Sequence, residues 1–194
     1  HRRGACAAPD QRGNVFAVSV KALVSELSRR GPHRVLRGNL ALVGQPGLVF
    51  TPGEGMSLPA VGFAHSWLSG AGNYADTLQH LASWGIVAAA PDTERGPMPS
   101  HVGLATDLLT VLDVCTGVRL GGGDISVHPN RVAVAGDGMG AGVAVLAAAK
   151  NSDIAAVGAL FPAVVSPSAE AVAPRVSAPG LVLTGSTVDK SAKA

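Results

Sequence analysis

Short apolar runs alternate with helical patterns along most of this chain. The apolar runs cover residues 58–64, 86–90, 131–135, 154–161 and 180–184, and the helical patterns between them cover 74–84, 102–120 and 139–150. Strands buried on both faces read as continuous apolar runs, and parallel neighbours need a helical crossover to connect them. The alternation therefore predicts an α/β fold: a mostly parallel sheet with helices on both faces.

The first part of the chain has a different pattern of apolar residues. Apolar residues at helical spacing over 16–27 predict an amphipathic helix, which Gly31-Pro32 ends. Alternation over 35–43 predicts a half-exposed strand, and the turn residues that follow lead into a second strand at 48–50. This part is expected to form an antiparallel hairpin at the start of the sheet. Residues 1–13 are expected to be a flexible arm, and 14–194 a single domain.

Composition excludes several classes of protein. The formal net charge is +2 and the charges are scattered, which argues against a nucleic-acid or membrane-surface protein. Apolar runs are interrupted within about ten residues, too short to span a bilayer. The two cysteines, Cys6 and Cys115, form neither a disulfide framework nor a metal-ligand spacing, and Cys115 is expected in the core. No cleavable signal sequence is visible, and a cytoplasmic location is the default expectation for a chain that starts at His1 rather than Met.

A glycine-rich turn carries the main chemical signal. Residues 136–140 read Gly-Asp-Gly-Met-Gly, between an apolar strand and a helix of small residues. A strand, a tight turn and a helix are the setting of the G-x-S-x-G nucleophile elbow, but Gly138 stands where the serine belongs. Such a turn needs small residues two positions before and after its nucleophile. Asp137 does not meet this requirement, because Met139 would then occupy the second small position.

Four segments carry a resemblance to a known family. They are residues 59–67, the stretch 80–92 (His-Leu-Ala-Ser-Trp-Gly-Ile-Val-Ala-Ala-Ala-Pro-Asp), the glycine turn, and residues 185–189. Over about 35–194 the chain resembles the dienelactone hydrolase and polyester-hydrolase (cutinase-like) branch of the α/β-hydrolases. Relatives usually read G-H-S-M-G-G at the elbow, so glycine replaces the serine here, and Asp137 replaces the histidine.

The resemblance implies ester hydrolysis through an acyl-enzyme, without metal or cofactor. It assigns the oxyanion donors to the backbones of Trp67 and Met139, and the catalytic acid to Asp189. The histidine base should follow one further strand, so the last strand and the histidine loop are expected to lie beyond Ala194. The substrate cleft is expected to include His65, Ser66 and Tyr74, with Ser66 standing where a glycine is common.

Individual side chains near these segments also have simpler interpretations. His65 is expected to shape its loop rather than act as a base, and Asp92 and Glu94 to hold a loop by hydrogen bonds. His80 and His101 are expected on the surface.

The missing serine leaves several functions open. The first is a noncatalytic descendant, a pseudoenzyme that binds a small ester-like ligand or a protein partner. The second is a serine ester hydrolase, either active through another nucleophile or inactivated by a mutation at 138, and the third is a structural subunit.

The turn Gly136 to Ala141 also fits G-x-G-x-x-A, which predicts a dinucleotide site. A dinucleotide site requires an acidic residue at the end of the next strand, whereas Asp153 lies at the beginning of that strand. The oligomeric state is left open.

Overall fold

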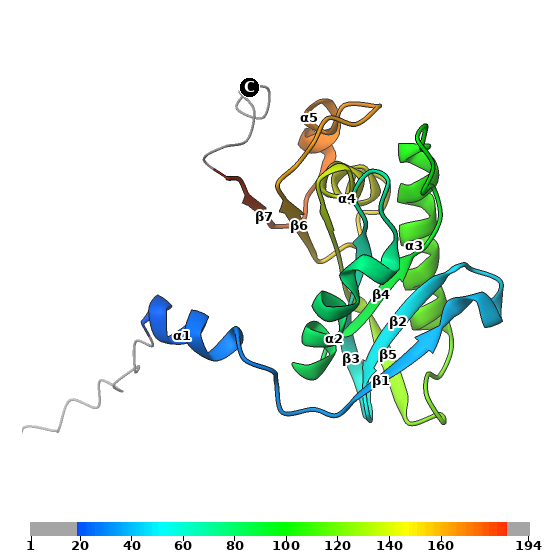
Figure 1. Cartoon of the computed structure of the whole chain (residues 1–194), viewed down its shortest axis with the longest axis vertical. Helices are drawn as coiled ribbons and strands as arrows, with labels where there is room; N and C mark the ends of the chain where they lie inside the picture. Colours follow the sequence, from blue (N-terminus) through cyan, green and yellow to red (C-terminus); the bar gives the residue numbers. More distant parts are fainter. Residues whose placement is uncertain (1–18, 186–194) are drawn as a thin grey trace, which may run out of the picture.

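The structure is a computed structural model that describes residues 19–185 (Figure 1). Its seven strands are β1 (Val35–Asn39), β2 (Gly47–Pro52), β3 (Gly55–Ala64), β4 (Val87–Pro91), β5 (Ile125–Asp137), β6 (Ala156–Leu160) and β7 (Gly180–Leu183). The α-helices are α1 (Val20–Leu27), α2 (Ala75–Ser83), α3 (His101–Gly117), α4 (Met139–Lys150) and α5 (Ala169–Val172), and 3₁₀ helices cover Leu40–Val43, Ala71–Tyr74 and Ala173–Arg175. Within this part of the chain, every helix is too short or too polar to cross a bilayer.

One sheet joins all seven strands in the order β1-β2-β4-β3-β5-β6-β7. β2 runs antiparallel to both of its neighbours, and the pairs from β4 to β7 are parallel. The predicted α/β fold, with an antiparallel hairpin feeding a mostly parallel sheet, is confirmed at this level.

The helices divide between the two faces of the sheet (Figure 1). α3 and α4 pack on one face, where Leu104, Leu108 and Val143 meet the buried strand residues. α2 packs on the other face, where Leu78 and Ala82 join a second core cluster. The connections after β3 and β5 therefore leave the sheet on opposite sides. In open α/β sheets, such neighbouring strand ends open a crevice at the carboxyl edge.

The strand predicted over 35–43 is only half right. β1 ends at Asn39, and the next four residues form a 3₁₀ helix. The Asn39 side chain accepts a hydrogen bond from the Ala41 N–H at 2.9 Å, which caps that helix and competes with a continued strand. Gly44, at φ +86°, ends it in a left-handed conformation. Leu40 is buried, so the apolar residue still reaches the core.

Two further boundaries differ from the expectation. β5 begins at Ile125 rather than at 131, because it pairs with β3 through a register shift around Pro129. α5 and the 3₁₀ helix after it occupy a stretch where no element was predicted, and the Ser168 side chain caps α5. Cys115 is fully buried as expected, while Cys6 lies outside the described residues.

Candidate functional site

The turn between β5 and α4 has an unusual backbone conformation at Gly138. Its φ is +56° and its ψ is −117°, a combination that strains a residue with a side chain. Hydrogen bonds fix the turn: the Gly138 N–H donates to the Leu160 carbonyl at 2.9 Å, and its carbonyl accepts from Ala141 and Ala163 at 3.1 and 3.0 Å. The strand therefore turns sharply into the helix at the position where an elbow would present its nucleophile.

The two glycines that flank Gly138, at positions 136 and 140, leave no room for a side chain. A Cβ on Gly136 would collide with the Gly140 carbonyl, and a Cβ on Gly140 would collide with the Ala64 carbonyl at the end of β3. Those are the two positions at which the sequence predicted small residues.

The side-chain space at position 138 is occupied by another residue. A Cβ built on Gly138 would collide with the hydroxyl oxygen of Ser66, from the loop after β3. Ser66 and Gly138, the two departures from the pattern of the family that the sequence resembles, thus lie against each other. Both residues stand out in the sequence, but their contact does not, because nothing in the local sequence of either one indicates it.

Tyr74 connects the loop after β3 to the elbow. Its hydroxyl accepts a hydrogen bond from the Ser66 N–H at 3.1 Å and donates one to Asp137 Oδ2 at 2.8 Å. Its ring packs against Phe63, with centroids 4.9 Å apart. Burial raises the pKa of Tyr74, and the hydrogen bond to Asp137 raises it further. Tyr74 therefore stays protonated and keeps the Asp137 carboxylate directed at the loop.

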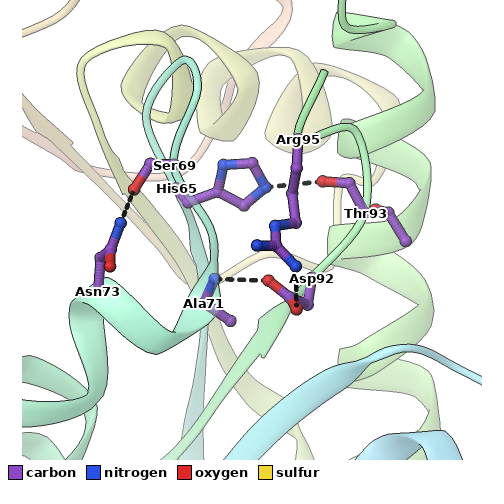
Figure 2. A network of polar contacts seen from close by, with 7 residues as sticks. All are labelled: His65, Ser69, Ala71, Asn73, Asp92, Thr93 and Arg95. Atoms are coloured by element: carbon purple, nitrogen blue, oxygen red, sulfur yellow. Dashed lines mark hydrogen bonds and ion pairs between the residues drawn. The ribbon is translucent and has the colours of Figure 1, made fainter.

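His65 holds two loops together from beneath the surface. Its side chain is fully buried, with Nδ1 2.9 Å from the Ser66 carbonyl. Nε2 lies 2.7 Å from the Thr93 carbonyl in the loop after β4 (Figure 2). Both nitrogens face acceptors, so neither is free to take a proton from a substrate hydroxyl. The geometry agrees with a loop-shaping role for His65.

Acidic side chains in the loop after β4 also make structural hydrogen bonds. Asp92 accepts from the Ala71 N–H at 2.9 Å and forms an ion pair with Arg95 at 3.2 Å (Figure 2). Glu94 accepts from the Ser100 N–H at 2.6 Å, just before α3. Beside this network lies a polar pocket of about 540 Å³, whose lining includes Ser69, Asn73, Asp92 and Arg95.

The two candidate oxyanion donors lie on the segments that meet at the crevice. Met139 is buried and is the first residue of α4, so its N–H has no acceptor inside that helix. Trp67 is half-exposed, and its indole N–H donates to the Pro97 carbonyl at 3.1 Å. Asp189, the candidate acid, lies outside the described residues.

The glycine turn lacks the acid that a dinucleotide site would use. β6 follows the turn and ends at Leu160, and Asp153 precedes the beginning of that strand. Asp137 is engaged by Tyr74. Within residues 19–185, no three His, Cys, Asp or Glu side chains lie close enough together to hold a metal ion.

Comparison with protein-family models finds no match to this chain, and comparison with curated proteins finds none either.

Proposed function

We propose that this chain is an α/β-hydrolase-fold protein related to the dienelactone and polyester hydrolases, and that it binds a small ester-like ligand without hydrolysing it. Two features support the relationship. The sheet begins with an antiparallel hairpin, and β5 turns into α4 through a glycine-flanked elbow. The resemblance of residues 59–67 and 80–92 to that family supports it further.

The loss of catalysis rests on one observation: Gly138 at the elbow, with the Ser66 hydroxyl against it. Without a side chain at 138, no acyl group can be transferred from that point. Removal of the serine from a catalytic triad lowers turnover by a factor on the order of 10⁶.

The groups that would bind a ligand remain. Apolar side chains are exposed on loops at the carboxyl edge of the sheet: Trp67 and Leu68 after β3, Met98 after β4, and Phe161 after β6. These can contact the acyl or alcohol part of an ester. The N–H groups of Trp67 and Met139 can donate to its carbonyl oxygen.

Binding can be followed through the fluorescence of Trp67, with p-nitrophenyl butyrate as the probe. In a Trp84→Phe variant, where Trp67 is the remaining tryptophan, the ester should quench the signal saturably while being hydrolysed no faster than in buffer. A matched Trp67→Phe variant, which keeps Trp84, should show no saturable quenching. Turnover of the ester by the unmodified chain, or quenching equal in both variants, would reject the proposal.

One observation favours a second candidate, an ester hydrolase that uses Ser66 as its nucleophile. The Ser66 hydroxyl lies where a side chain at 138 would be. Against it, His65 directs both ring nitrogens at carbonyl oxygens and is not free to act as its base. Ester turnover that is lost in Ser66→Ala but kept in Ser69→Ala would replace the noncatalytic proposal with this one.

A further inference from the structure

Part of the α2 face of the sheet is bare. α2 packs against β2 and β4, and beside it lies an apolar groove of about 510 Å³. Its lining includes Phe63 from β3, Leu81 from α2, Ala133 and Ala135 from β5, and Leu160 from β6. Among residues 19–185, α2 is the one helix that contributes to this lining. Sheets of this type are normally covered on both faces, whereas in the described part of the chain this groove is open beside α2.

Helix α1 carries an apolar stripe that the described part of the chain leaves largely exposed. Val20, Leu23, Val24 and Leu27 recur at helical spacing and are 78%, 45%, 61% and 44% exposed. None of its eight residues is buried. Isolated helices shorter than about 12 residues are marginal in water, so a helix of this length needs a packing partner.

The attachment of α1 directs it away from its own sheet. The Leu27 carbonyl accepts from His80 Nε2 at 2.8 Å, and the Arg29 carbonyl accepts from the Trp84 indole N–H at 3.0 Å. The Gly31 N–H donates to Ser83 Oγ at 2.8 Å. These bonds fix the end of α1 at the end of α2, and from there the helix extends outward from the molecule (Figure 1).

Charges on the two surfaces are complementary. At about 100° per residue, Lys21 and Glu26 flank the apolar stripe of α1 on opposite sides. At the groove, exposed Arg131 lines the β5 side. A helix placed with its stripe in the groove can therefore direct Glu26 toward Arg131.

We infer that two copies of this chain exchange their α1 helices, each apolar stripe packing into the groove of the other copy. Every copy offers one helix and one groove, so the exchange closes at two copies with two-fold symmetry and leaves neither surface unpaired. It also uses two separate surfaces of each copy.

The first test compares two glutamates placed on α1. Leu23→Glu puts a charge into the stripe, whereas Ser25→Glu puts the same charge on the opposite side of the helix. Sedimentation should show a dimer for the unmodified chain. Leu23→Glu should raise its dissociation constant at least about tenfold, and Ser25→Glu should leave it unchanged. A monomeric unmodified chain, or equal effects of the two variants, would overturn the inference.

A charge-reversal experiment distinguishes exchange from closure within one chain. Glu26→Arg and Arg131→Glu should each weaken the dimer, because each places like charges against one another. Mixing the two variants should restore dimers that contain one copy of each, since both pairings across the interface then become opposite in sign. Failure of the mixture to form dimers, although each variant alone weakens them, would overturn the exchange.

Discussion

Gly138 meets two requirements that no other residue meets together. Its φ of +56° strains any residue with a side chain, and its side-chain space is taken by the Ser66 hydroxyl. With Ser66 in its described rotamer, a side chain at 138 would collide with the Ser66 hydroxyl, so one of the two must shift. Gly138, which we propose stands at a vacant nucleophile position, is therefore part of a local arrangement that involves two residues.

Substitution of Gly138 by alanine should destabilise the protein. The positive φ alone should lower the free energy of unfolding by about 1–3 kcal/mol, and the collision with Ser66 should add to this. Denaturant unfolding measures the effect. Gly72→Ala, where an added Cβ would meet nothing within 4 Å, should change stability far less. In the Ser66→Gly background, Gly138→Ala should be less harmful, and equal effects in both backgrounds would contradict the contact.

Cys115 should make stability fall at high pH. Burial raises the pKa of its thiol from 9.0 to about 12 in the folded protein. Below pH 9 the thiol is protonated in both the folded and the unfolded chain, so its full contribution to the free energy of unfolding is present. Between pH 9 and 12 the unfolded chain loses the proton first, and unfolding should become easier by about 1.4 kcal/mol per pH unit. Denaturant unfolding of the unmodified protein and of Cys115→Ala from pH 8 to 10.5 checks this: parallel curves would contradict it.

At the scale of elements, the sequence predicted best where one periodicity runs without interruption. The predicted helix 139–150 is α4, and the apolar run 86–90 lies one residue from β4. Errors arose where a polar side chain or a proline competes with the periodicity. Asn39 caps a helix within an alternating pattern, and Pro129 interrupts the first half of β5.

The segment between α1 and β1 should depend on one buried hydroxyl. Ser83 is fully buried, donates to the His80 carbonyl at 2.6 Å and accepts from the Gly31 N–H at 2.8 Å. Ser83→Ala leaves that N–H without its acceptor and should lower the free energy of unfolding by about 1–3 kcal/mol. Hydrogen exchange at the Gly31 amide should accelerate. Ser25→Ala, on the exposed side of α1, is the control, and unchanged exchange in Ser83→Ala would contradict the assigned role.

For the whole molecule, the sheet topology decides where the site lies. α2 leaves the carboxyl end of β3 toward one face, and α4 leaves β5 toward the other, so the loop with Ser66 and the turn with Gly138 meet between them. The sequence could predict this meeting, because it follows from strand order and from the strand-turn-helix pattern. It could not predict that the Ser66 hydroxyl fills the vacant position. Such a contact depends on the geometry of two distant segments, and each serine or glycine is locally ordinary.

Acylation of the protein by p-nitrophenyl acetate, followed by intact mass, tests the vacant elbow most directly. The unmodified protein should remain unacylated, and Gly138→Ser should react slowly because Ser66 obstructs the new hydroxyl. Adding Ser66→Gly should accelerate acylation at position 138 at least about tenfold, as expected when a misplaced reacting group is brought into line, whereas adding Ser69→Gly instead should not. Acylation of the unmodified protein, or equal rates in both double variants, would contradict the account of Gly138 as an empty nucleophile position closed by Ser66.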